Sequence, residues 1–445
     1  MLMLRTLFKA CLTLCLFSSC SSTLMQHEAS TAAYKQGHLS QAETILTRTI
    51  AKEMPSGNFQ QSKEAVCLLL NRATIHFASG NIDEAIADYN LAIEALDYYA
   101  QDSTLDSAGQ VLLEDGSAAY NGSDLEHLLA RIYFALALIE KGDINNAYAL
   151  LRQAEEIQQT KTQRHAKVSY LSAIACDGNA LGKFLFATLL DQQGDVSNAA
   201  ILFRQAEALA GCMPTEINLP PLDPKKKATV ILICHNGIVP FKISGTSPAS
   251  LASTLALEAI LCTQRIDPAW SSITGIPTPL LCQQPQSEPL PTYATINKTR
   301  IPLKPWFNIA QATSAELEQN MPVIVARGVA RYLIRRTAVA QAQKHDPHLG
   351  ALVDLGMLIA NANTQADTRS WSTLPSSIDL ARCILPAGEH CLTITVARQG
   401  LPNFEQHIPL QLKAGDLCFI NIFNINPRTT KILVPSQFRI KGDPL

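Results

Sequence analysis

The sequence lacks an excess of positive charge. Its 445 residues carry 36 lysines and arginines against 38 aspartates and glutamates, a formal net charge of −2. Proteins that bind a polyanion such as DNA or RNA usually present a basic field on one face. We therefore expect no nucleic-acid partner.

The sequence also lacks the short motifs of common catalytic and nucleotide-binding sites. It has no phosphate-binding glycine loop, no dinucleotide fingerprint and no Gly-x-Ser-x-Gly elbow. His345 and His348 are interrupted by Pro347, and no cysteine or carboxylate cluster completes a set of metal ligands around them. We expect no catalytic residues, no metal and no cofactor, and we predict that the protein is not an enzyme.

A regular disulfide framework is absent as well. Twelve cysteines occur, and the nine that follow Cys20 are irregularly spaced. An odd, irregular set favours buried free thiols over a disulfide scaffold. Cys383 and Cys391, which flank a short turn, are the best candidates for a disulfide.

The apolar run near the N-terminus is too short to span a bilayer, but it has the features of a secretory signal. Arg5 and Lys9 precede the apolar run 10–17, and small residues follow it. The letters LFSSC, which end at Cys20, resemble the lipoprotein box of bacterial signal peptides. This resemblance implies a signal peptide over residues 1–19, a lipid on Cys20, and an outer-membrane lipoprotein that faces the periplasm. Simple secretion and an uncleaved anchor are the alternatives.

One element occurs four times in the first half of the chain. The copies are GHLSQAETILTRT, GNIDEAIADYNLA, GDINNAYALLRQA and GDVSNAAILFRQA, and an apolar-periodic stretch precedes each glycine. Each copy has alanine five residues after the glycine and an apolar residue at nine, and three copies have alanine at twelve. We expect four helical hairpins, in which glycine ends the first helix and the alanines let neighbouring backbones approach. The packing positions are Gly37, Ala42, Gly80, Ala85, Tyr89, Ala92, Gly142, Ala147, Ala154, Gly194, Ala199, Phe203 and Ala206.

This pattern resembles the tetratricopeptide repeat. The usual 34-residue period of that repeat is broken here, because successive glycines lie 43, 62 and 52 residues apart. The resemblance implies a compact helical arc that binds protein surfaces in a concave groove and carries out no chemistry. The alternative is that the helices only pack on the rest of the chain.

The second half of the chain has a different pattern. Four prolines predict a linker over 211–226. The run ATVILICHNGIVPFKIS then predicts two strands joined by a tight hairpin at Asn236-Gly237. A long helix is expected from Met321 to about Gln343, a second helix over 350–362, and a small β-sandwich from alternating runs such as LKAGDLCFINI.

These patterns predict an α+β protein of two domains. The first is an all-α domain of TPR-like hairpins over residues 20–210. The second is a mixed domain over 227–445, with a β-sandwich-like sheet and a helical insert.

The order of features along the chain resembles an uncharacterised family of Gram-negative lipoproteins. It is carried by the lipoprotein box, the degenerate hairpins, a strand that ends in HNG, Met321-Pro322 before the long helix, and the runs ADTRSWSTLP and LPAG. The resemblance implies an envelope location, sometimes beside lipoproteins that activate cell-wall synthases. It implies no established activity.

Asp367, Arg369 and Trp371 alternate along a short extended stretch, so we expect them to share one face. One interpretation is a structural clamp that joins the helical insert to the sheet, and the other is a ligand pocket that includes His235. Cys234 and His235 are adjacent on a strand and should point to opposite faces, which argues against a catalytic pair.

The sequence therefore predicts a membrane-anchored envelope scaffold. Its helical repeats would bind envelope proteins, and its lipid would contact the membrane. The alternative is an enzyme or a glycan-binding module with a site near His235, Arg369 and Trp371. The sequence leaves the oligomeric state open.

Overall fold

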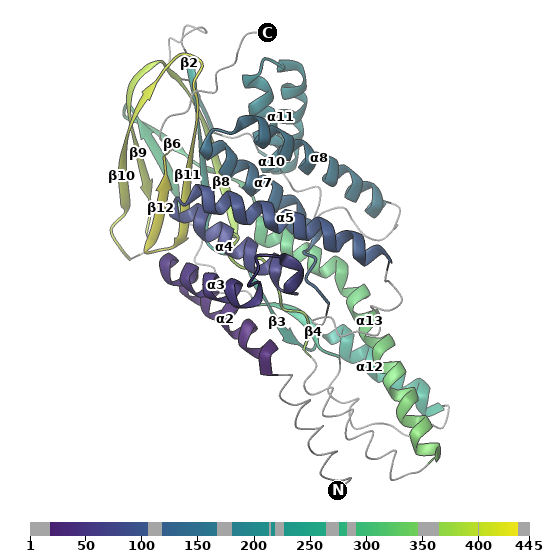
Figure 1. The fold of residues 1–445 in the computed structure, drawn as a ribbon. Coiled ribbons are helices and arrows are strands. Elements are labelled where there is room, and N and C mark those ends of the chain that lie inside the picture. The colour runs from purple at the N-terminus through teal and green to yellow at the C-terminus, as the bar shows by residue number, and fades with distance from the viewer. Residues whose placement is uncertain are drawn as a thin grey trace.

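A computed structural model gives the fold of the chain (Figure 1). It describes residues 18–105, 118–166, 180–212, 215–218, 227–263, 276–282, 291–345, 365–398 and 400–434. Most of the predicted signal peptide and the whole predicted helix 350–362 lie outside the described residues. Among the helices described, none has the length and apolar character needed to cross a membrane.

The first half of the chain folds into helical pairs that lie side by side in chain order (Figure 1). Each pair has its two helices in close contact, and the second helix of one pair packs against the first helix of the next. The helices are α2 (Ser18–Lys35), α3 (Leu39–Glu53), the 3-10 turn η1 (Phe59–Gln61), α4 (Ala65–Ser79), α5 (Ile82–Leu105), α7 (Asp124–Lys141), α8 (Ile144–Ala166), α10 (Ala180–Gln192) and α11 (Val196–Ala210).

The repeated glycines and alanines explain this packing. Gly37, Gly80, Gly142 and Gly194 have φ of +81°, +85°, +87° and +88°, the left-handed conformation that ends a helix and that other residues resist. The alanines that follow at five and twelve residues are at most 2% exposed, so the two helices of a pair can approach closely. These buried alanines are Ala42, Ala85, Ala92, Ala147, Ala154, Ala199 and Ala206, and Tyr89 is also fully buried whereas Phe203 is half-buried.

The strands of the second half form three sheets. A six-stranded mixed sheet has the order β1-β8-β2-β11-β12, with β7 paired to β8; a four-stranded antiparallel sheet has the order β10-β9-β5-β6; and β3 pairs with β4. The strands are β1 (Thr215–Asn218), β2 (Lys227–Asn236), β3 (Phe241–Gly245), β4 (Thr278–Cys282), β5 (Thr292–Ile296), β6 (Thr299–Pro302), β7 (Lys304–Phe307), β8 (Ser377–Pro386), β9 (Gly388–Val396), β10 (Phe404–Leu412), β11 (Leu417–Asn426) and β12 (Thr429–Leu433).

The mixed sheet is buried on both faces. Along β2, Val230 and Leu232 face the four-stranded sheet and join its core, whereas Ile231 and Ile233 face the helices and join theirs. This alternation follows from the two-residue period of a strand. The result is three layers, with the helices, the mixed sheet and the antiparallel sheet in that order (Figure 1). The predicted α+β class and the sandwich of sheets are confirmed.

One local prediction is wrong. β2 does not turn back into a hairpin with β3, because the N–H of Gly237 donates to the carbonyl of Asn424 on β11 and that of Val239 to the carbonyl of Leu374, which directs the chain away from the sheet. Cys383 and Cys391, the best candidates for a disulfide, are free thiols, which is the state that the irregular cysteine spacing favoured. The side chain of Cys383 is buried between the two sheets, whereas that of Cys391 is exposed on β9, so the two point to different environments.

Two further segments differ from their expected form. Thr215–Asn218, within the predicted linker, pairs in parallel with β8. The long helix α13 (Ile309–His345) begins well before Met321 and contains Pro322. Pro322 has no N–H to donate to the carbonyl of Glu318, an exposed residue four positions before it. With α12 (Pro248–Thr263), α13 forms an arm that extends from the body of the protein (Figure 1).

Candidate functional site: the groove of the helical hairpins

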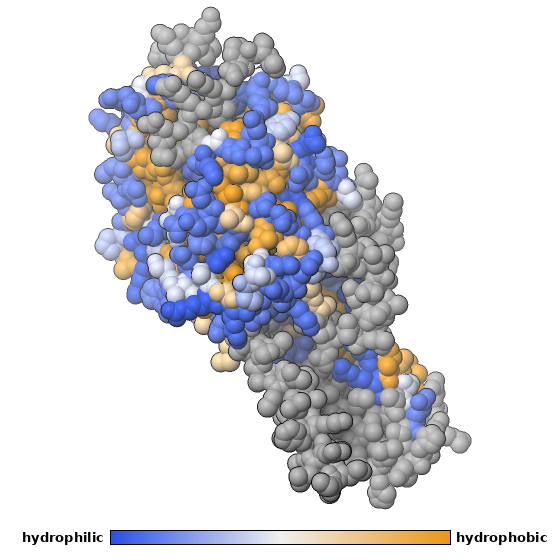
Figure 2. All heavy atoms as spheres, viewed as in Figure 1, coloured by the Kyte–Doolittle hydropathy of each residue, from blue (hydrophilic) through white to orange (hydrophobic). Residues whose placement is uncertain are grey.

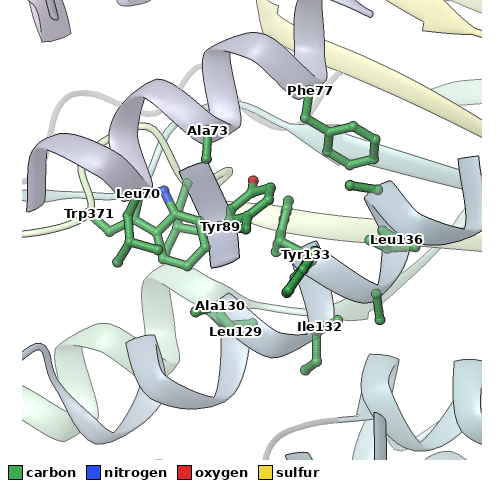
Figure 3. Close-up of a cluster of buried hydrophobic side chains, with 14 of the residues drawn as sticks. Leu70, Ala73, Phe77, Tyr89, Leu129, Ala130, Ile132, Tyr133, Leu136 and Trp371 are labelled. Atoms are coloured by element: carbon green, nitrogen blue, oxygen red, sulfur yellow. The ribbon is translucent and has the colours of Figure 1, made fainter. Parts of the chain in front are cut away.

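The inner surface of the hairpins holds a segment of the second half of the chain. We call residues 367–374 the groove segment, because the indole of Trp371 in this segment enters the groove formed by α4, α5 and α7. Trp371 is 1% exposed, and its indole N–H donates to the hydroxyl of Thr74 on α4 at 2.8 Å. The indole lies 6.1 Å from the ring of Tyr89 and 5.6 Å from that of Tyr133, centroid to centroid (Figure 3).

Asn71 on α4 binds the backbone of the groove segment on both sides of Trp371. Its Nδ2 donates to the carbonyl of Ser370 at 3.3 Å, and its Oδ1 accepts from the N–H of Thr373 at 3.0 Å. Asn71 has no exposed surface, and without it the buried N–H of Thr373 would lose this acceptor, whereas the carbonyl of Ser370 also accepts from the thiol of Cys67. The fully buried side chain therefore fixes how the segment lies in the groove.

His27 on α2 stands behind Asn71. Its Nε2 lies 3.1 Å from Asn71 Nδ2 and 3.3 Å from the sulfur of Cys67, which in turn donates to the carbonyl of Ser370 at 3.2 Å. Burial lowers the pKa of His27 to about 4, so the ring is neutral at pH 7 and can accept from the amide. This contact ties α2 to the same segment.

Glu126 connects the start of α7 to the groove segment. Ser123 and Glu126 form a capping box, in which the carboxylate accepts from the N–H of Ser123 at 3.0 Å. The same carboxylate accepts from the hydroxyl of Tyr120 at 2.5 Å and from the N–H of Trp371 at 2.7 Å. Because Glu126 is 7% exposed, a carboxylate that normally caps only its own helix here also holds a distant part of the chain.

Arg369 and Asp367 form a two-pronged ion pair at the edge of the groove. Arg369 Nε and Nη2 donate to the two oxygens of Asp367 at 2.8 and 2.7 Å. Arg369 Nη1 donates to the carbonyl of Ala118 at 2.9 Å, and the guanidinium lies 5.3 Å from the ring centre of Tyr120. The pair therefore joins the groove segment to the loop that precedes α7, and not to the sheet as the clamp interpretation had expected.

A pocket of about 510 Å³ lies beside the groove segment. Its walls come from that segment, the loop before α7, the chain after β2 and one face of α13. Asp367, Arg369 and Trp371 are among the residues that line it, and His235 is not. Glu316 from α13 also lines it, and burial raises the pKa of this carboxyl, whose Oε1 accepts from the N–H of Leu125 at 3.1 Å.

His235 lies on the far side of the aromatic cluster. Its Nδ1 is 3.0 Å from the hydroxyl of Tyr133, its Nε2 is 3.1 Å from Asn421 Oδ1, and its ring stacks on Phe423 with 4.4 Å between centroids. Burial lowers the pKa of His235 to about 4. The ring is therefore a neutral part of the interface between the helices and the sheet, and Tyr133 separates it from Trp371.

The neighbouring thiol of Cys234 points away from His235. Cys234 belongs to the core between the sheets, and burial raises its pKa well above the ordinary range of a thiol. The two side chains therefore lie on opposite faces of β2 and do not form a nucleophile–base pair. Among the residues that the structure describes, no group of three or more histidines, cysteines or carboxylates is placed to hold a metal ion.

The sequence pointed to part of this site. It singled out Asp367, Arg369 and Trp371, but not Asn71 or Glu126. Both had a readable signal: Glu126 completes the Ser-x-x-Glu pattern of a capping box, and Asn71 is a polar residue within the apolar run AVCLLLNRATI.

Comparison with known protein families finds a tetratricopeptide repeat over residues 68–95. The match covers most of α4 and the first part of α5, the hairpin that supplies Asn71, Thr74 and Tyr89. No curated protein matches the chain. The repeat supports a role in protein–protein interaction, because such hairpins generally bind other proteins.

The site yields a prediction about Asn71. Asn71→Ala should lower the free energy of unfolding by about 2–4 kcal/mol, because the buried N–H of Thr373 loses its acceptor and the carbonyl of Ser370 loses one of its donors. The measurement is urea unfolding followed by circular dichroism. Asn90→Ala is the matched control, because the amide of Asn90 donates to Glu94 on an exposed face of α5, and its cost should stay under about 0.5 kcal/mol. Equal losses in the two variants would contradict this account of the groove.

A second prediction concerns pH. Burial raises the pKa of Glu140, on α7, to about 7, and its Oε1 accepts a hydrogen bond from Asn421 Nδ2 on β11 at 2.5 Å. The folded state therefore binds a proton more tightly than the unfolded state, so this carboxyl lowers stability as pH rises from about 4.5 to 7. Glu140→Gln keeps the acceptor and removes the ionisation.

The stability of Glu140→Gln relative to the parent protein should increase between pH 4 and pH 8 by about 1–2 kcal/mol. Urea unfolding at the two pH values measures it. Glu94→Gln, an exposed change on α5, should show no such trend. A stability difference for Glu140→Gln that stays constant with pH would rule out the assigned ionisation.

Proposed function

We propose that the protein is a non-enzymatic lipoprotein of the Gram-negative cell envelope that gathers other envelope proteins through its helical repeats. In this proposal a lipid on Cys20 anchors the chain to the outer membrane, and the folded part faces the periplasm. The lipoprotein box LFSSC and the order of motifs along the chain support the anchor and the location. The tetratricopeptide match supports protein binding.

The groove is not the docking surface in this proposal. The groove segment fills the inner face of the hairpins. On this face the hairpins therefore pack on the rest of the chain and do not bind a partner protein. A partner that bound there would have to remove Trp371 from a site in which it is 1% exposed. Protein binding therefore needs another face of the array.

The outer face of α11 is the observation that carries the proposal. The second helix of each earlier pair is covered by the next pair: α3 packs on α4, α5 on α7, and α8 on α10. α11 holds the corresponding position in the last described pair, where Val196, Ile201 and Leu209 are 61%, 45% and 37% exposed. Helical arrays grow by stacking on this face, and terminal repeats usually present a polar one. An amphipathic helix of a partner protein fits the position of the next helix.

The pocket beside the groove segment favours a second candidate function, binding of a small ligand or glycan. It gathers three of the predicted residues, Asp367, Arg369 and Trp371. The guanidinium of Arg369 is already held by Asp367 and Ala118, and the indole N–H of Trp371 is bonded to Thr74. Because these polar groups serve the fold, we rank ligand binding below protein docking.

The docking proposal predicts the effect of a charge on α11. Ile201→Glu should reduce recovery of partner proteins about tenfold after crosslinking in intact cells and affinity purification, because a carboxylate at the centre of an apolar contact must be desolvated. Quantitative mass spectrometry measures the recovery. Leu401→Glu is the matched control, since Leu401 is similarly exposed, at 40%, in the connection between β9 and β10. If both variants recover the same proteins in equal amounts, α11 is not the docking surface.

The anchor gives a separate prediction. The N-terminal peptide of the purified protein should begin at Cys20 and carry the mass of attached acyl chains, and Cys20→Ser should abolish that mass and release the chain from the membrane fraction. Peptide mass spectrometry and fractionation check both outcomes. A Ser18 variant, Ser18→Ala, should leave lipid and location unchanged. An unmodified thiol at Cys20 in membrane-bound protein would refute the anchor.

A further inference from the structure

The arm has an exposed face without charge. The sequence of α12 is PASLASTLALEAILCT, in which Glu258 is the single charged residue, and Glu258 is buried. Leu251, Leu255 and Ile260 are 37%, 53% and 55% exposed. The other exposed residues between them are small or weakly polar: Ala252, Ala256, Ala259 and Cys262. The whole outward side of this helix is therefore apolar.

The inward side of the arm is polar, the reverse of an ordinary surface helix. Glu258 Oε1 accepts from Arg336 Nε at 3.1 Å and from the hydroxyl of Tyr332 at 2.6 Å, both on α13. Thr254 and Ser250, one and two turns earlier, are fully buried on the same side. A helix that points its charged residue inward and leaves Leu251, Leu255 and Ile260 outward has a surface suited to an apolar surrounding.

The exposed apolar residues of α13 lie on another side of the arm. Val323 and Arg327 line the pocket beside the groove segment, whereas Tyr332 and Arg336 bond to Glu258 on α12. Figure 2 shows apolar side chains on the described part of the arm, at the lower right of the molecule. An uncharged apolar face such as that of α12 matches a helix that lies in a membrane interface.

The arm lies toward the same end of the molecule as the start of α2. In Figure 1 the first residues of α2 and the arm of α12 and α13 both lie below the body, whereas α11 lies at the opposite end. Cys20 is in the first turn of α2. A lipid at that position would therefore bring the arm, and not α11, toward the bilayer.

The size of the stripe argues against a second copy of the chain as its occupant. A face one helix wide and 16 residues long covers about 24 Å by 10 Å, or on the order of 250 Å², whereas a stable interface buries about 800 Å² on each partner. A lipid surface has no such requirement, because it can cover any apolar face presented to it.

We propose that the arm formed by α12 and α13 is a second membrane contact, with the outward face of α12 at the boundary between lipid headgroups and acyl chains. This inference rests on the proposed lipid at Cys20 for its orientation. The acyl chains on Cys20 hold the protein at one point, and a second apolar contact fixes how the protein stands on the surface. The arm then holds α11 away from the bilayer, where a partner can reach it.

Fluorescence of the full chain reconstituted in vesicles with brominated acyl chains tests this proposal. Leu255→Trp places a reporter on the outward face of α12, and Ile201→Trp places a matched reporter on α11. We expect about twofold quenching of the added emission for Leu255→Trp and none for Ile201→Trp, because bromine quenches only indoles within the acyl region. Absence of quenching at position 255 would overturn the proposal.

Two further readouts separate the alternatives. Mild oxidation in detergent-free vesicles should leave the chain monomeric, and a dimer crosslinked through the exposed Cys262 would show that a second copy covers α12 and overturn the lipid contact. Mass analysis of the Cys20 peptide in the same samples separates this proposal from the anchor. Quenching at position 255 with an unmodified Cys20 would support the arm contact and refute the lipid anchor. A lipidated Cys20 without quenching at position 255 would support the anchor and refute the arm contact.

Discussion

The structure depends on satisfying the polar groups of a short segment inside an apolar groove. The groove segment brings backbone N–H and carbonyl groups into the space between the hairpins and the sheet, where water cannot pair with them. Asn71 and Glu126 supply those partners, and the indole of Trp371 fills the volume between α4, α5 and α7. Without these two side chains the same aromatic packing would carry a large desolvation cost. The hairpins and one face of the mixed sheet therefore share an apolar core, although they come from different halves of the sequence.

The surfaces of the protein follow from this arrangement. The inner face of the helical array and both faces of the mixed sheet are used by the fold. Most of the large apolar side chains that the described residues leave exposed lie on α11 or on the arm, at opposite ends of the molecule (Figure 1). A scattered exposed leucine needs no explanation, but a helix face that lacks charge over its whole length usually meets something. The two surfaces differ in kind: α11 carries Arg204 among its exposed residues, whereas the outward face of α12 has no charged residue at all.

Local patterns allowed much of the fold to be predicted. The glycine–alanine spacing predicted four hairpins because both residue types are needed within one repeat. Glycine allows the left-handed turn between the two helices, and alanine lets the helices pack closely. The alternation of apolar residues similarly identified the sandwich. The prediction of a hairpin at Asn236-Gly237 was wrong because the Asn-Gly pair indicates only the local turn preference. The hydrogen bonds of Gly237 and Val239 go instead to residues far along the chain. Asp367, Arg369 and Trp371 could be identified as a group because they are closely spaced in the sequence, as the hairpin positions are. Their location in the groove depends on α4 and α7, so it could not be predicted from that spacing.

The distance along the chain between the groove and its occupant has a consequence for biogenesis. Asn71 and Thr373 are separated by 302 residues. During synthesis or export from the N-terminus, the hairpins emerge first, and their aromatic inner face stays uncovered until the last fifth of the chain arrives. Contacts between such remote segments form slowly, and the exposed surface is prone to aggregation in the interval. A chain that lacks the groove segment would therefore leave the aromatic inner face of the hairpins without its cover.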